Sequence, residues 1–263
     1  MNTISVVIRN KNQAQALEFL LKNLIQRYIE DIDEIIVIDN LSIDGSDLVA
    51  KKYGAKFIKI QNFSYGGSAN LAAESSKNDI IVIFSAHSFP VSHDFFKLIK
   101  EKFKGRESEL AGLRCIHNSS DYSKYINGIT ANQEPNGSGL MFAGSVFNKQ
   151  VWKKIPFKSD IRTLEDKEWT KRVLKEGYLV EFVPSIFCYE INRTRSQIFF
   201  RLKNEVIGGY QLWHVNHTLI SCIKSFFISV ASIFKNGVID LFYAFKTLFF
   251  MIRFIFNKPE KFN

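Results

Sequence analysis

Cysteine is scarce in this sequence, and its three cysteines lie far apart. Cys115, Cys188 and Cys222 form no CxxC pair in the 263-residue chain. Their spacing argues against a disulfide framework and a cysteine zinc site, and it favours a reducing compartment. Internal repeats and low-complexity tracts are also lacking. The apolar run at residues 4–8 is too short for a secretory signal, and no basic segment precedes it.

Long apolar runs and acidic residues are also in short supply. Residues 219–256 are apolar, but their longest uncharged run, Ser225 to Phe234, is far shorter than the roughly 20 residues of a membrane-spanning helix. Asp and Glu total 26 against 35 Lys and Arg, which gives a net charge of +9. Because hydrophobic residues still make up 46% of the chain, the composition excludes a disordered tail or a collagen-like fibre.

The positive charge is concentrated toward the C-terminal end. Residues 193–263 contain ten Lys or Arg and three Asp or Glu, whereas residues 1–192 contain 25 and 23. The excess is therefore +7 in the last part and +2 in the first. A basic segment that is also rich in Phe favours contact with an anionic membrane, and the near-neutral first part argues against a nucleic-acid binder.

Apolar strands and amphipathic helices alternate along the first hundred residues. Continuous Val/Ile runs separated by helical patterns indicate parallel strands that are covered on both faces. The sequence therefore predicts an α/β fold with a Rossmann-like, mostly parallel sheet and flanking helices. The predicted strands are 4–8, 34–39, 56–60, 79–84 and 179–184, and the predicted helices are 14–27, 46–53, 68–76, 93–103 and one that begins near Leu164.

Polar residues follow these strands, where open parallel sheets bind their ligands. Position alone is weak evidence, because a loop that only turns the chain also contains small polar residues. The Asp-Gly pair at Asp44 and Gly45 predicts a turn rather than a ligand contact. The candidate ligand-binding residues are Arg9, Asn10, Asn12, Asp39, Ser68, Asn70, Ser85 and His87.

Four segments together resemble a known family. They are SVVIRNKN at 5–12, IDNLSIDGS at 38–46, GGSANLAAESSKNDIIVIFSAHSFP at 66–90 and LEDKEWTKRV at 164–173. Over about residues 3–192 the chain resembles the inverting family 2 glycosyltransferases of the GT-A fold, and its opening motif is similar to that of rhamnosyltransferase-like members. The resemblance implies a nucleotide-sugar-dependent enzyme of the hexosyltransferase class.

The resemblance also assigns roles to particular residues. Asp39 is then a contact of the donor nucleotide, and Asp166, beside Glu165, is the base that takes the proton of the acceptor hydroxyl. Each role has an alternative. Asp39 would also suit a strand-end turn, and an acidic pair at a helix N-terminus is favoured by the helix dipole alone. Ser68 and Asn70 fit helix capping as well as donor binding.

The sequence departs from the family at the metal motif. Ser85-Ala86-His87 stands where the family has Asp-x-Asp, whose carboxylates hold Mg²⁺ or Mn²⁺ against the donor diphosphate. His87 is a candidate metal ligand or a direct diphosphate contact, and Glu190 is a candidate oxygen ligand. Alternatively, three arginines replace the metal, because guanidinium groups suit phosphate oxygens. These diphosphate-binding candidates are Arg193, Arg195 and Arg201.

The C-terminal region carries a regular basic pattern. Lys224, Lys235 and Lys246 recur every eleven residues, which places them on one face of a helix, and Arg253 stays near that face. Phe, Ile and Leu occupy the other faces. This pattern predicts two amphipathic helices, divided at Gly237, that lie on a membrane surface. A helical pair packed on the catalytic domain or in a homodimer interface is the alternative.

The sequence therefore predicts a GT-A domain over 1–195 and a membrane-associated helical region over 196–263. The expected activity is sugar transfer from a nucleotide sugar to a saccharide or lipid-linked saccharide. The expected location is the cytoplasmic face of the cell membrane, within surface polysaccharide biosynthesis. The missing metal carboxylate keeps one alternative open, a catalytically degenerate scaffold that binds a nucleotide or glycan in a membrane-bound assembly.

Overall fold

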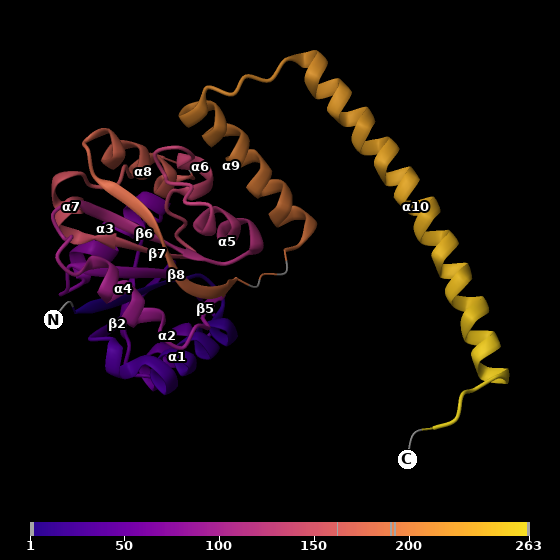
Figure 1. Cartoon of the computed structure of the whole chain (residues 1–263), viewed down its shortest axis with the longest axis horizontal. Helices are drawn as coiled ribbons and strands as arrows, with labels where there is room; N and C mark the ends of the chain where they lie inside the picture. The colour runs from indigo at the N-terminus through magenta and orange to yellow at the C-terminus, as the bar shows by residue number, and fades with distance from the viewer. Residues whose placement is uncertain (1–2, 162, 190, 192, 262–263) are drawn as a thin grey trace. The chain divides into compact units, whose positions relative to one another are not determined.

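The sheet at the centre of the fold mixes parallel and antiparallel strands. The computed structural model describes residues 3–161, 163–189, 191 and 193–261, and within them the sheet has eight strands in the order β3-β2-β1-β4-β7-β6-β8-β5 (Figure 1). The strands are β1 (Ile4–Asn10), β2 (Glu34–Asp39), β3 (Lys56–Lys59), β4 (Ile80–Ser85), β5 (Ser88–Pro90), β6 (Leu110–Ile116), β7 (Gly144–Asn148) and β8 (Leu179–Tyr189).

Strand direction agrees with the prediction in the first half of the sheet and is mixed in the second. β1 runs parallel to β2 and β4, β2 to β3, and β6 to β8. β7 is antiparallel to both β4 and β6, and β5 is antiparallel to β8. The mostly parallel α/β sheet is confirmed, and the predicted strands at 4–8, 34–39, 56–60, 79–84 and 179–184 correspond to β1, β2, β3, β4 and β8.

Helices cover both faces of the sheet. They are α1 (Ala14–Tyr28), α2 (Ser46–Lys52), α3 (Tyr65–Ser75), α4 (Phe95–Phe103), α5 (Ser119–Ile126), α6 (Pro135–Ser138), α7 (Lys149–Lys154), α8 (Glu165–Lys175), α9 (Arg195–Trp213) and α10 (Leu219–Phe256), with a short 3₁₀ turn at Ile29–Asp31. One core joins β-strand side chains to α1, α2 and α4. A second core, on the other face, joins them to α3, α7 and α8.

Alternate side chains of β1 pack into these two cores. Val6 and Ile8 of β1 belong to the core with α1, and Val7 belongs to the core with α3. All three side chains are fully buried. This two-sided burial explains why β1, β2 and β4 are continuous apolar runs rather than alternating patterns.

The register of the parallel strands brings their polar ends together. Asn10 of β1 lies opposite Asp39 of β2, and Arg9 of β1 lies opposite Ser85 of β4. The turn predicted at Asp44 and Gly45 is present. Asp44 accepts hydrogen bonds from Ser46, and Gly45 has a φ of 84°, in the left-handed region that favours glycine.

Contacts divide the chain into two units, Met1–Leu212 and Trp213–Asn263. The predicted boundary at residue 195 therefore differs from the contact boundary, because α9 packs with the first unit. A Cβ on Gly208 would lie 2.8 Å from the Leu164 side chain, and the Lys171 ammonium donates to the Leu212 carbonyl at 2.9 Å. We therefore describe α9 together with the α/β unit.

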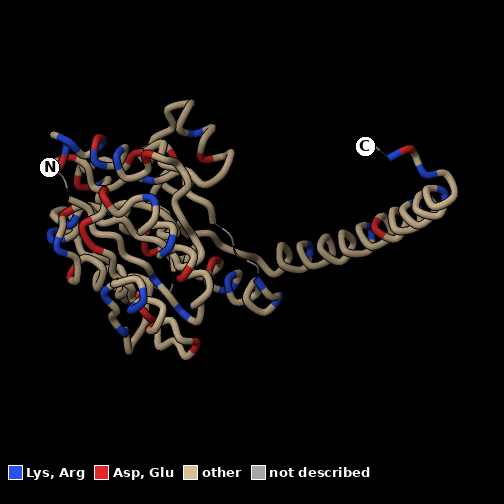
Figure 2. The backbone as a smooth tube through the Cα atoms, turned by 90° about the horizontal axis from the view of Figure 1, so that it is seen from below, with Lys and Arg blue, Asp and Glu red and all other residues tan. Residues whose placement is uncertain are grey.

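The second unit contains one helix where two were expected. α10 runs unbroken from Leu219 to Phe256, so the predicted break at Gly237 is wrong. A single glycine costs a helix only about 1 kcal/mol, which the rest of a 38-residue helix tolerates. None of the residues of α10 is buried, and basic side chains recur along it (Figure 2). No helix in the described ranges combines the length and apolarity needed to cross a membrane.

Candidate functional site

Asp39 and Asn10 form a buried polar pair at the ends of β2 and β1. The fully buried Asp39 carboxylate accepts hydrogen bonds from Asn10 Nδ2 at 2.8 Å, Ser42 Oγ at 2.6 Å and the Ser42 backbone N–H at 2.8 Å. Asn10 Oδ1 is buried and has no hydrogen-bond partner within the described part of the chain. Such an acceptor is costly unless a donor reaches it, and a nucleoside N–H or hydroxyl would supply one.

Asn12 joins the loops that follow β1 and β2. Its backbone N–H donates to Ser42 Oγ at 2.7 Å, and its Oδ1 accepts from the backbone N–H of Ile43 at 3.0 Å. Its φ of 49° places it in the left-handed region, which asparagine tolerates better than most residues. Ser42 thus links Asn12 to Asp39. We did not predict a role for Ser42, although its place inside the IDNLSIDGS segment was a usable signal.

Ser68 and Asn70 are engaged within the protein. Ser68 is fully buried, and its hydroxyl donates to the Tyr65 carbonyl of the same helix at 2.7 Å. Asn70 Oδ1 accepts from Trp152 Nε1 at 2.8 Å and from the Phe157 N–H at 3.0 Å, while its Nδ2 donates to the Phe157 carbonyl at 2.9 Å. These bonds fasten α3 to neighbouring segments. The geometry therefore gives both residues a structural role, and their contact with the donor stays a prediction.

An ion pair joins the end of β1 to the start of α8. Arg9 Nη1 lies 2.8 Å from Glu165 Oε1, and the two side chains are 12% and 5% exposed. Arg9 Nη2 donates to the Phe142 carbonyl at 2.8 Å, and the guanidinium lies 5.5 Å from the Tyr65 ring centre. Arg9, predicted as a donor contact, therefore positions Glu165. Burial raises the pKa of the Glu165 carboxyl, which the guanidinium opposes and the neighbouring Asp166 reinforces.

Asp166 is held in place by backbone groups. Its Oδ2 accepts from the Phe142 N–H at 3.0 Å, and its Oδ1 accepts from the Lys167 N–H at 2.8 Å. A carboxylate offers about four acceptor positions, so Asp166 keeps lone pairs for another donor. Leu164, which precedes the acidic pair, has a φ of 64°, a sparsely populated conformation for a branched apolar side chain. The turn into α8 thus brings Glu165 to Arg9 at the end of β1 and places Asp166 beside it.

His87 lies just beyond β4 with one ring nitrogen engaged. Its Nδ1 is 2.7 Å from Gln13 Oε1, which fixes the proton on Nδ1 when the amide oxygen accepts. Its Nε2 is buried without a hydrogen-bond partner among the described residues. Burial, together with the charges of Arg193 and Arg9, lowers the pKa of His87 to about 4. At neutral pH, Nε2 is therefore a lone-pair acceptor, which does not suit the predicted alternative of donation to a diphosphate. Ser85, at the end of β4, is half-buried.

The three predicted arginines occupy different surroundings. Arg193 Nη2 donates to the Tyr189 hydroxyl at 2.6 Å, and its guanidinium lies 5.8 Å from the centre of that ring. Arg201 pairs with Glu205 at 2.5 Å, which raises the pKa of its guanidinium, and Tyr189 and Tyr65 lie near enough to add to that effect. Arg195 is exposed at the start of α9. The structure thus brings Arg193 and Arg201 toward Tyr189 and gives Arg195 no comparable contact.

A second polar network follows β6, and we did not predict it. His117 Nδ1 lies 2.5 Å from Asp121 Oδ2, and Arg114 Nη2 lies 2.9 Å from Asp121 Oδ1. Arg114 and Lys167 both donate to the Gly139 carbonyl, at 2.7 and 2.9 Å. Burial lowers the pKa of Lys167 to about 8. The network connects the start of α8 to β6, and the spacing of four residues between His117 and Asp121 was the available signal.

The described residues do not fit a divalent cation at the end of β4. Across 3–161, 163–189, 191 and 193–261, no three or more His, Cys, Asp or Glu side chains lie close enough together to hold a metal ion. His87 offers a single nitrogen, and its charged neighbours are Arg193 and Arg9. Mg²⁺ prefers oxygen ligands that include carboxylates, and imidazole suits it poorly. Glu190, the second predicted ligand, lies outside the described residues.

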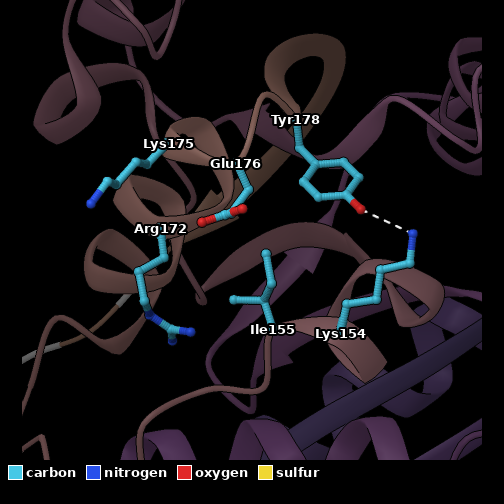
Figure 3. Close-up of a pocket in the computed structure, with 6 residues that line it drawn as sticks. All are labelled: Lys154, Ile155, Arg172, Lys175, Glu176 and Tyr178. Atoms are coloured by element: carbon cyan, nitrogen blue, oxygen red, sulfur yellow. Dashed lines mark hydrogen bonds between the residues drawn. The ribbon is translucent and has the colours of Figure 1, made fainter.

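A surface pocket of about 500 Å³ lies at the other end of α8 (Figure 3). Its basic side chains are largely engaged. Arg172 bonds to Glu168 and to the Pro156 carbonyl, and Lys154 donates to the Tyr178 hydroxyl at 3.1 Å. No predicted site residue lines this pocket, whose lining is Lys154, Ile155, Arg172, Lys175, Glu176 and Tyr178.

The comparisons with known proteins agree with this fold. Residues 5–173, more than half of the chain, match the glycosyl transferase family 2 profile. A search of curated proteins found no match. The fold is similar to that of the mannosyltransferase PcManGT from Pyrobaculum calidifontis, solved with GDP-Man and Mn²⁺, at 15% identity and a TM-score of 0.65, over 83% of this chain and 66% of that one.

Two further solved structures share the fold. Glucosyl-3-phosphoglycerate synthase from Mycobacterium tuberculosis, solved with Mn²⁺, UDP and glucosyl-3-phosphoglycerate, matches at 13% identity and a TM-score of 0.60, over 82% of each chain. S. aureus TarS 1-349 matches at 14% identity and a TM-score of 0.58, over 71% of this chain and 60% of that one. Thus this chain spans less than two thirds of that TarS structure. With the family match over β1 to α8, the chain belongs to glycosyl transferase family 2 and is a glycosyltransferase of the GT-A fold.

Proposed function

We propose that this glycosyltransferase transfers a sugar from a nucleotide-sugar donor to a hydroxyl of a saccharide or lipid-linked saccharide. The observation that carries the proposal is the ion pair between Arg9 and Glu165, which brings the acidic start of α8 to the strand ends. The buried pair of Asp39 and Asn10 lies at those same ends and suits a nucleoside. Nucleotide-bearing complexes of structures with this fold support a nucleotide-linked donor.

In this proposal Asp166 is the general base. Glu165 is tied to Arg9, whereas Asp166 is oriented by two backbone N–H groups and keeps lone pairs for a proton. The acceptor oxygen forms a bond to the anomeric carbon, and its proton passes to the Asp166 carboxylate. The bond from that carbon to the diphosphate oxygen breaks, and its electron pair leaves with the nucleoside diphosphate. Attack opposite the leaving group inverts the anomeric configuration.

The substitution Asp166→Asn tests this assignment. We expect turnover to fall by about 10²- to 10⁴-fold, because the amide cannot accept the proton, while donor affinity stays within about twofold. Release of nucleoside diphosphate measures turnover, and calorimetric titration measures donor binding. Glu176→Gln, at the opposite end of α8, is the matched control and should keep full turnover. Wild-type turnover in Asp166→Asn would refute the role of base.

The finer parts of the proposal rest on resemblance and sequence pattern. The opening segment SVVIRNKN supports a rhamnosyltransferase-like enzyme within the hexosyltransferase class, acting in surface polysaccharide biosynthesis. A donor screen with several nucleotide sugars would identify the transferred sugar. The replaced metal motif at Ser85-Ala86-His87 favours one second candidate, a degenerate nucleotide- or glycan-binding scaffold. Donor binding without turnover in the wild-type chain would support that candidate instead.

The second unit supports attachment to the cytoplasmic face of the cell membrane. α10 is about 57 Å long, none of its residues is buried, and Phe226, Phe242 and Phe249 are 62%, 59% and 67% exposed. So large an apolar surface is unusual in a protein without a partner. The positive charge of the basic stripe, Lys224 and its repeats, is complementary to the negative charge of anionic lipid headgroups.

Vesicle co-sedimentation tests the membrane part. We expect binding to vesicles that contain phosphatidylglycerol and weak binding to pure phosphatidylcholine. A triple charge reversal, Lys224→Glu with Lys235→Glu and Lys246→Glu, should weaken binding by about a hundredfold or more, at about 1 kcal/mol per lysine removed. Reversal of the exposed lysines Lys51, Lys97 and Lys104 is the matched control. Equal loss in both variants, or a stable homodimer that binds no vesicles, would refute this attachment.

A further inference from the structure

The side chains around Tyr189 form a basic cluster at the end of β8. The Tyr189 ring packs edge-on against His87, with 5.0 Å between ring centres. Arg193 donates to the Tyr189 hydroxyl at 2.6 Å. Arg201 lies near Tyr189 and Tyr65, whose hydroxyls, when ionised, raise the pKa of its guanidinium. Arg9 stacks on the Tyr65 ring at 5.5 Å. Three guanidinium groups therefore lie near the two tyrosines, and besides burial the charges of two of them, Arg193 and Arg9, lower the pKa of His87, just beyond β4.

Two of these guanidinium groups already have carboxylate partners. Arg9 pairs with Glu165 at 2.8 Å, and Arg201 pairs with Glu205 at 2.5 Å. Arg193 forms no ion pair with any carboxylate of the described residues. Its hydrogen bond and its cation–π contact are both with Tyr189. A half-buried guanidinium with spare donors attracts an anion with two adjacent acceptor oxygens.

The same charges act against a divalent cation. Arg193 and Arg9 are close enough to His87 to disfavour its protonation, so they also repel a dication beside its ring. The Glu165 carboxylate offsets the charge of Arg9, but Arg193 has no such partner among the described residues. No group of three or more His, Cys, Asp or Glu side chains that could hold a metal ion occurs in the described part of the chain. The Mn²⁺ named for two structures with this fold therefore has no matching ligand set among the described residues of this chain.

We propose that Arg193, supported by Arg201, binds the diphosphate of the donor directly and takes the place of the divalent cation. The ligand class is a nucleoside diphosphate group, so this inference rests on the proposed function. The guanidinium neutralises the negative charge that grows on the departing diphosphate, a role otherwise filled by a metal ion. His87 Nε2, neutral and unpartnered, accepts a hydroxyl of the donor at the same place. Donor binding by this chain is then independent of divalent metal.

Calorimetric titration of the full-length chain tests the inference. The probes are UDP, GDP, ADP and dTDP and the matching monophosphates, each with MnCl₂ or with EDTA. We expect at least one diphosphate to bind with the same affinity, within about threefold, under both conditions. Arg193→Ala should weaken that binding by about 10- to 150-fold, because a charge-assisted hydrogen bond is lost. The monophosphates should be affected less.

Arg27→Ala is the matched control, because Arg27 is an exposed arginine at the end of α1 with no predicted role in the site. It should bind the diphosphate within about twofold of wild type. Arg193→Lys keeps the charge and removes the paired N–H donors of the guanidinium, so it should show an intermediate loss, and it serves as the test if Arg193→Ala does not fold. Binding that EDTA abolishes and Mn²⁺ restores would overturn the inference and leave the proposed function intact. Equal losses at Arg193 and Arg27 would also overturn it. No binding of any diphosphate under either condition would overturn both.

Discussion

Replacing Arg9 with methionine isolates the energetic role of the ion pair between β1 and α8. The substitution Arg9→Met keeps an unbranched chain of similar length and removes the charge. Glu165, 5% exposed, then remains buried without its partner. Loss of one member of a buried pair costs about 3–5 kcal/mol, so we expect the free energy of unfolding at pH 7 to fall by about that amount.

The loss should depend on pH because Glu165 can take up a proton. Its pKa in the folded chain is already above the ordinary value of 4.5, and removing Arg9 removes the main opposing influence. At pH values between the pKa of Glu165 in the unfolded chain and its higher pKa in the folded chain, the folded state keeps the Glu165 proton and the unfolded state releases it. Stability therefore falls as pH rises from about 4.5 through the folded pKa, by at most about 1.4 kcal/mol per pH unit for one group. Between pH 7 and pH 5 the variant should recover up to about 2.7 kcal/mol.

Urea unfolding of wild type and Arg9→Met at pH 5, 6 and 7 measures both effects. The double variant Arg9→Met with Glu165→Gln provides the control, because a neutral amide does not require the guanidinium. We expect it to regain most of the lost stability at pH 7 and to show little pH dependence. A penalty for Arg9→Met that is the same at pH 5 and pH 7, or a double variant no more stable than the single one, would refute the reasoning.

Three other perturbations follow from the contacts. Asp121→Ala should lower the free energy of unfolding by about 3–5 kcal/mol in chemical denaturation, because the buried Arg114 guanidinium loses its carboxylate; a loss under 1 kcal/mol would contradict the role of that pair. Gly66→Ala should destabilise the fold by about 1–3 kcal/mol, because the added Cβ would overlap the Lys158 carbonyl. Gly209→Ala, at a helical position with open space, should stabilise it by about 0.5–1 kcal/mol. Equal effects of the two substitutions in thermal unfolding would count against these packing assignments. His87 should stay neutral down to about pH 4 in an NMR titration of its ring, since burial and nearby guanidinium groups oppose its charge; a midpoint near 6.5 would show that it is not enclosed as described.

The parallel half of the fold was predictable because its central strands β1, β2 and β4 are buried on both faces. Two-sided burial leaves a continuous Val/Ile run that is visible without any partner, as in β1, β2 and β4. β7 and β5 leave weaker signals. β5 has only three residues, and β7 lies between β4 and β6 because of pairing across the sheet rather than because of local pattern. The prediction of two helices divided at Gly237 was wrong, because the helical backbone of α10 continues through that glycine.

The location of the site could be predicted from the sequence, but the contacts that its residues make with one another could not. Residues that follow buried strands are readable from sequence, which located Asp39 and Asn10, whereas the acidic pair of α8 was located by the resemblance of its segment to the family. The hydrogen-bond partner of a polar side chain depends on how distant segments pack together. The hydrogen bond from Trp152 to Asn70 could therefore not be predicted from the sequence. The network of His117 and Asp121 was missed because polar loop residues look alike until the sheet brings them together.

The distance along the chain between Arg9 and Glu165 has a consequence during synthesis. The two residues are separated by 156 positions. At translation rates of about 5–20 residues per second, the ribosome needs about 8–30 s to add Glu165 after Arg9. During that interval β1, β2 and β4 can assemble the nucleoside half of the site, since their pairing is complete by Ser85. Under the proposed function the proton-accepting half arrives last, so the nascent chain has its nucleoside contacts before it has its general base.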